Sequence, residues 1–185
     1  FNISNTFIMI WFVNLIEKTV CTFIKMKAED EEYRLRFITG GMLSTAELSI
    51  LQAHKEICLF AKRTSRMFNM VKELFYEKSE EPFLKIYSRI EKYENISDRM
   101  DDEIANYLTA VSEGRLSSES KEEIRVMLRA VSEIESIADS CNNMARSIKR
   151  RNEFKSEFTE DQNRHIDHMF DLVGQALDRM NFLLH

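Results

Sequence analysis

Gly114-Arg115-Leu116-Ser117-Ser118 is the stretch that decides the fold, because it is the clearest helix stop and start in the chain. Apolar residues at helical spacing lead up to it from residue 83 and continue beyond it to residue 148. A short connection makes neighbouring helices antiparallel. We therefore expect the two arms to form a helical hairpin.

Two pairs of acidic residues lie at equal distances on either side of this turn. Glu94 and Asp98 precede it, and Glu135 and Asp139 follow it. Each pair has the spacing E-x-x-x-D, which places both carboxylates on one face of a helix. In an antiparallel hairpin all four would reach the same level, where like charges require a cation or a basic partner.

The neighbours of these acids leave two interpretations open. Asp101 continues the row on the first arm, while Asn142 and Asn143 follow on the second, and such carboxylate and amide oxygens suit a hard cation. The same spacing also arises by chance in a chain with 31 acidic residues, and the usual result is a solvated helix face. Arg99 and Arg146 are alternative partners for the acids.

Two further helices complete the prediction. One begins at Ser44-Thr45-Ala46-Glu47 and the other at Thr159-Glu160-Asp161-Gln162, and both sequences fit a capping box. The predicted core stripe of the first includes Leu48 and Leu51, and that of the last includes Met169 and Val173. The predicted fold is all-α: an antiparallel bundle of about four helices over residues 44–185, with an apolar helix before it.

The composition supports long helices and argues against some classes of function. Gly and Pro number only 4 and 1, and 44% of the residues are hydrophobic. The net charge of -5 argues against a nucleic-acid partner. The three cysteines are widely spaced and form no C-x-x-C motif, which is typical of reduced packing residues in an intracellular domain.

The first 43 residues form a separate appendage in this interpretation. Residues 7–13 are apolar but fewer than the roughly 20 needed to cross a bilayer. Lys18, Lys25 and Lys27 follow, so residues 1–26 are predicted to be the cytoplasmic end of a membrane helix or an amphipathic anchor. Residues 27–43 are predicted to be a polar hinge, and a chain that begins at Phe1 is expected to be a fragment.

Signatures of catalysis are missing from the sequence. No Glu stands three residues before any of the 4 histidines, as a ferritin-like di-iron enzyme would need. The sequence shows no phosphate-binding Gly-rich loop and no nucleophile beside a base. His165 and His168 are one turn apart, but they lack a third ligand and fit a surface pair. We therefore predict that the protein is not an enzyme.

With these residues placed, the chain resembles the C-terminal portion of the bacterial sodium/phosphate cotransporter family, in which a PhoU-like helical domain follows the last membrane helix. Residues 1–6 (F-N-I-S-N-T) are similar to the family's entry into its final membrane segment, and residues 45–57 (T-A-E-L-S-I-L-Q-A-H-K-E-I) resemble the start of its first bundle helix. Residues 135–145 (E-S-I-A-D-S-C-N-N-M-A) resemble the PhoU signature E-R-I-G-D-H-A-x-N-I-A, and residues 94–98 match its companion E-x-x-x-D.

The resemblance implies a metal site. In PhoU proteins these E-x-x-x-D pairs hold clusters of iron or zinc, so it nominates six residues of this chain as metal ligands. They are Glu94, Asp98, Glu135 and Asp139, with Asp101 and Asn143 as secondary candidates. The chain departs from the signature at Ala138-Asp139-Ser140, where an imidazole is lost, and it has room for one bundle rather than two three-helix repeats.

The resemblance also implies a role. The expected function is that of a cytoplasmic regulatory domain of a sodium-dependent phosphate transporter at the inner membrane. Its expected partner is the transmembrane transport domain of the same polypeptide, with the membrane contacted through the N-terminal segment, and a homodimer is a further expectation. Two alternatives stay open: a structural helical interaction or dimerisation module without metal, and a free-standing PhoU-type regulator of phosphate uptake.

Overall fold

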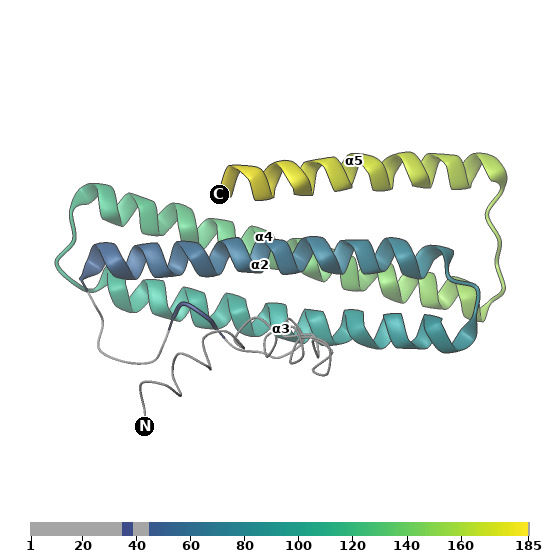
Figure 1. Cartoon of the computed structure of the whole chain (residues 1–185), viewed down its shortest axis with the longest axis horizontal. Coiled ribbons are helices and arrows are strands. Elements are labelled where there is room, and N and C mark those ends of the chain that lie inside the picture. Colours follow the sequence, from purple (N-terminus) through teal and green to yellow (C-terminus); the bar gives the residue numbers. More distant parts are fainter. Residues whose placement is uncertain (1–34, 39–44, 185) are drawn as a thin grey trace, which may run out of the picture. The chain divides into compact units, whose positions relative to one another are not determined.

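The computed structural model describes residues 35–38 and 45–184, all within one compact unit that spans residues 33–185. The described residues form four α-helices and no strand (Figure 1). These helices are α2 (Ala46–Tyr76), α3 (Glu80–Ser112), α4 (Ser118–Glu153) and α5 (Glu160–Leu184). The predicted all-α bundle is confirmed. The predicted apolar helix and most of the hinge fall outside the described residues.

The turn between α3 and α4 forms where the sequence predicts it. The Gly114 N–H donates to the Val111 carbonyl as α3 ends. Ser117 is the N-cap of α4, and its side chain accepts a hydrogen bond from the Ser120 N–H at 3.1 Å. The helical hairpin that places the acid pairs is therefore present.

The two predicted capping boxes have different outcomes. At α5 the box is complete, because the Gln162 N–H donates to Thr159 Oγ1 and the Thr159 N–H donates to Gln162 Oε1. At α2 the N-cap is Thr45, and its side chain makes no capping hydrogen bond. Ser44 lies outside the described residues.

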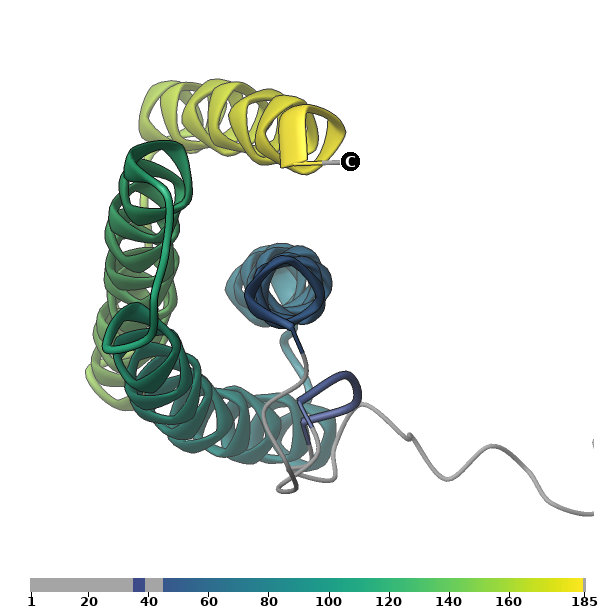
Figure 2. The same cartoon turned by 90° about the vertical axis from the view of Figure 1, so that its left-hand side faces the viewer.

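Helices α2, α3 and α4 pack against one another, whereas α5 packs chiefly on α2 (Figures 1 and 2). The core therefore lies mainly among the first three helices, and α5 adds Phe170 and Leu177 to it from one side. Residues Met100, Ile104 and Leu108 of α3 are completely buried, as is Val131 of α4. None of the four described helices combines the length and the apolar character that a bilayer crossing requires.

The prediction of core residues is wrong at the start of α2 and along α5. Leu48 and Leu51 are 46% and 48% exposed, because the first turns of α2 bury Ser49, Ile50 and Ala53 instead. In α5 only two residues are buried, and both Met169 and Val173 are exposed. A helix that packs on one neighbour can cover only part of a wide apolar arc.

A short segment before α2, residues 35–38, is tied to the bundle by Glu56. This side chain is completely buried, and its Oε2 accepts hydrogen bonds from the backbone N–H groups of Arg36 (3.0 Å) and Phe37 (2.8 Å). Lys55 lies above the Phe37 ring, 5.9 Å from its centroid. The described part of the predicted hinge, residues 35–38, is thus fixed to α2 through its backbone.

Candidate functional site

The helical hairpin brings the predicted acids into one interacting group. Burial raises the pKa of Glu94, and repulsion from Asp98 and from Asp139 across the hairpin adds to this. Burial also raises the pKa of Asp98, again with repulsion from Asp139. The carboxylates of α3 and α4 therefore repel one another, as their equal distances from the turn predict.

Two more acids belong to the same group. The pKa of Glu135 is raised by burial first and then by Asp139, Asp101 and Asp98. The pKa of Asp101 is raised by burial, with a contribution from Asp98. The group, which we call the acid cluster, comprises Glu94, Asp98, Asp101, Glu135 and Asp139. The raised pKa values of Glu94, Asp98, Asp101 and Glu135 indicate that added positive charge would stabilise the cluster.

Asn142 is the residue at this site that the sequence argument ranked too low. It is 2% exposed, its side chain forms a hydrogen bond that lowers the pKa of Glu94, and its Oδ1 has no hydrogen-bond partner within the described residues. Arg146 also lowers the pKa of Glu94 by its charge. The spacing Glu135, Asp139, Asn142 is i, i+4, i+7, which is the signal that could have found it.

Asn143, the amide nominated by the resemblance, lies elsewhere on α4. It is exposed and lines a groove toward α5, together with Ser140 and Met144. Ser147 Oγ donates to its carbonyl oxygen at 3.0 Å. The structure therefore places Asn142, rather than Asn143, beside an acid of the cluster.

The donor chemistry of the acid cluster fits a hard cation, since it offers carboxylates and one buried unpaired amide oxygen. The side chains are not closely gathered: among the described residues, no three His, Cys, Asp or Glu side chains are grouped so that they could hold a metal ion. His165 and His168 are exposed on α5. A metal role for the six nominated residues stays a prediction.

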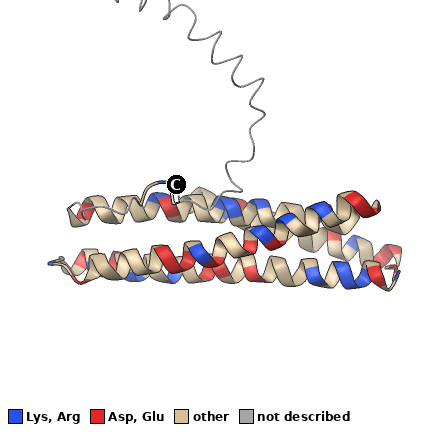
Figure 3. Cartoon of the chain, turned by 90° about the horizontal axis from the view of Figure 1, so that it is seen from below, with Lys and Arg blue, Asp and Glu red and all other residues tan. Residues whose placement is uncertain are grey.

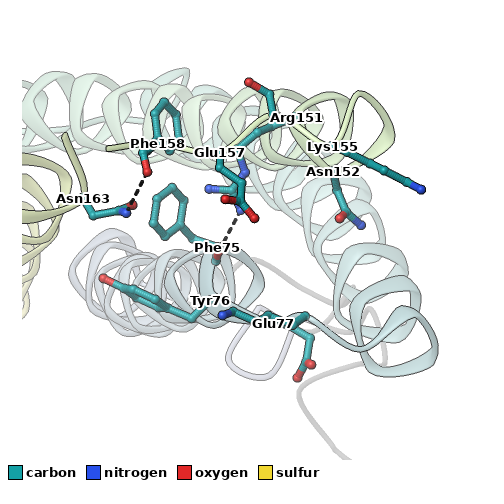
Figure 4. Close-up of a pocket in the computed structure, with 11 residues that line it drawn as sticks. Phe75, Tyr76, Glu77, Arg151, Asn152, Lys155, Glu157, Phe158 and Asn163 are labelled. Carbon is teal, nitrogen blue, oxygen red and sulfur yellow. Dashed lines mark hydrogen bonds between the residues drawn. The ribbon is translucent and has the colours of Figure 1, made fainter. Parts of the chain in front are cut away.

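A second site, which the sequence argument missed, lies where α2, α4 and the loop before α5 meet (Figure 4). A cavity of about 720 Å³ is lined there by Arg151, Phe75 and Phe158 among others. The Arg151 guanidinium lies 4.4 Å from the Phe75 ring centroid and 5.4 Å from that of Phe158, and it donates to the Phe75 carbonyl at 2.9 Å. Because Arg151 is already engaged, its main role is to join these segments.

Charges outside these sites are mixed. Figure 3 shows acidic and basic residues interspersed along the helices. Exposed pairs such as Arg125 with Glu122 and Arg164 with Asp161 contribute little to stability. The acid cluster is therefore distinguished by its like charges and by the half-buried positions of Glu94, Asp101 and Glu135.

Comparison with known proteins gives one family match. Residues 57–148 match the family model of the PhoU domain. The matched range begins in α2, ends in α4 and includes the acid cluster, Asn142 and Asn143, while α5 lies beyond it. Neither a curated protein nor a solved structure gives a significant match to the chain.

Proposed function

We propose, from the premise that residues 57–148 form a PhoU-like domain, that this chain regulates phosphate homeostasis as the cytoplasmic domain of a sodium-dependent phosphate transporter. The lysines that follow the apolar residues 7–13 support this assignment, because positive charge flanks the cytoplasmic end of membrane helices. The partner would be the transmembrane transport domain of the same polypeptide at the inner membrane. The role is regulatory binding and not catalysis.

The family match carries the regulatory role, and the acid cluster inside the matched range carries the metal-binding part of the proposal. Glu94, Asp98, Glu135 and Asp139 would hold a divalent or trivalent metal such as iron or zinc, with Asp101 and an asparagine of α4 in support. When bound, the metal would supply positive charge that neutralises the repulsion between α3 and α4. Removal of the repulsion would then stabilise this pair of helices and make their packing responsive to metal supply.

The test is elemental analysis of the full chain, purified without a histidine tag and incubated with several divalent ions. Glu135→Ala with Asp139→Ala removes two acids of the cluster, and Glu119→Ala with Glu123→Ala is the matched control at the same spacing in α4. We expect a stoichiometric metal in the wild type and the control, and its loss in the first variant. Metal in all three proteins, or in none, would exclude the cluster as a metal site.

The free-standing PhoU-type regulator is supported equally by the family match, because the match lies within the bundle. The coding sequence upstream of Phe1 separates the two. Several apolar spans there would favour the transporter, whereas a start codon immediately before Phe1 would favour the free-standing regulator. If the chain binds no metal but apolar spans are found upstream, the regulatory role would stand. The acids would then be residues of a solvated helix face.

A further inference from the structure

Helix α5 carries two apolar stripes, and only one of them is covered. The first faces α2, where Phe170 and Leu177 are buried. The second, which we call the outer stripe, consists of exposed Met169, Leu172, Ala176 and Leu183, and it includes half-buried Met180, part of which packs against the core. Exposed apolar stripes of this kind mark interaction sites.

The outer stripe is symmetric about Ala176. Leu172 and Met180 lie four residues on either side of it, and Met169 and Leu183 lie seven residues on either side. Offsets of four and seven keep all five residues on one face of a helix. A two-fold axis through Ala176 would place each apolar residue opposite another, since an isologous interface pairs a surface with itself.

The surface beside the outer stripe contains a groove with an uncharged lining. A groove of about 490 Å³ separates the facing sides of α4 and α5, with Phe68 and Phe75 of α2 also lining it. Its α4 wall includes Ser140 and Ser147, which are small enough for a backbone to approach closely. Its lining residues include no Asp, Glu, Lys, Arg or His, so an apolar occupant would leave no charge unpaired there.

We infer that two copies of this chain associate through α5, with the outer stripes packed antiparallel across a two-fold axis at Ala176. Met169 of one copy lies beside Leu183 of the other, and the groove wall adds to the interface. A helix of 25 residues is about 37 Å long. Stable dimers bury roughly 800 Å² on each partner, which requires the groove as well as the stripe. This inference is independent of the metal and of the transporter.

The first test measures the mass of the full chain by sedimentation over a concentration series. Leu172→Glu places a charge in the outer stripe, and Leu84→Glu is its matched control, because the two leucines are 51% and 50% exposed on α5 and α3. We expect the wild type and the control to dimerise, and Leu172→Glu to raise the dissociation constant at least tenfold. Circular dichroism should show the same helix content in all three proteins.

Two results would overturn the inference. A monomeric wild type would show that a second copy does not cover the outer stripe. Equal dissociation constants for the two variants would place any self-association elsewhere.

The second test examines the symmetry by cysteine cross-linking. In a Cys21→Ser background, Ala176→Cys places a thiol at the two-fold axis, and Ala110→Cys places one on an exposed position of α3. The native Cys58 and Cys141 are buried. Mild oxidation should link two copies through Cys at position 176 only, because a disulfide needs Cα atoms within about 7 Å. Absence of this link in a dimeric protein would exclude the antiparallel arrangement.

Discussion

Glu56 shows how much one side chain can contribute outside the acid cluster. It is completely buried, and its carboxylate accepts two backbone hydrogen bonds from the segment before α2. Burial raises its pKa, while the two backbone hydrogen bonds and the charge of Arg63 lower it in part. Glu56 therefore connects α2 to the backbone of residues 36–37.

Glu56→Ala should release that connection. The N–H groups of Arg36 and Phe37 lose their acceptor, so their exchange with solvent should accelerate at least tenfold, and the free energy of unfolding should fall by about 1–3 kcal/mol. Hydrogen exchange with mass spectrometry measures the first effect and urea denaturation the second. Glu73→Ala, at an exposed position of the same helix, should leave both values unchanged. Unaltered exchange at residues 36–37 in Glu56→Ala would contradict the role.

The N-termini of α5 and α2 differ in their capping hydrogen bonds. Thr159→Ala should destabilise α5 by about 1 kcal/mol, because it removes the acceptor for the Gln162 N–H. Thr45→Ala is the same substitution at the N-cap of α2, where the side chain makes no capping bond, and it should have almost no effect. Urea denaturation followed by circular dichroism compares the two variants. Equal losses would show that the capping box does not stabilise α5.

The ends of helices were predictable from the sequence because their signals are local. Gly114 and the serines after it mark the turn, and Thr159 with Gln162 marks the start of α5. The buried face was less predictable at Leu48 and along α5. Helical periodicity identifies which residues are apolar on one side, but it does not reveal how many neighbouring helices cover that side.

At the scale of the whole molecule, the charges of α3 and α4 give a pH dependence with a definite sign. The raised pKa of Asp98 means that the folded state binds its proton more tightly than the unfolded state does. Ionisation above that pKa therefore lowers the free energy of unfolding, and the loss disappears below the ordinary Asp pKa of about 3.9. Asp98→Asn should raise the free energy of unfolding at pH 7 by about 0.5 kcal/mol, a small value because water and salt screen an exposed group.

Glu119 supplies the opposite case. Its pKa is lowered, because its carboxylate accepts hydrogen bonds from its own backbone N–H and from Ser117. Its contribution to stability is present above the ordinary Glu pKa and is lost as the pH falls through the lowered value. Glu119→Gln should therefore lower the free energy of unfolding at pH 7. Urea denaturation in a chelator, at pH 7 and at about pH 3, compares the two variants, and changes of the same sign would refute the assignment.

The acid cluster was predictable because one turn fixes the register of two helices. The sequence did not reveal whether Asn142 or Asn143 lies beside the acid cluster. That depends on how α4 is rotated about its own axis when the bundle packs. Arg151 was not predictable as a junction residue. Its partners Phe75 and Phe158 come from separate segments, and no sequence spacing records that they meet.

The arrangement of α5 gives this unit two levels of cooperativity. Helices α2, α3 and α4 close on one another, and one of the two core clusters draws its buried residues from these three helices alone. Helix α5 is held mainly by one neighbour, with Lys72 paired to Asp171 at 2.9 Å on its surface. Partial opening can thus occur at a smaller free energy than global unfolding. An event that acts on α5 needs to supply only that smaller amount of free energy.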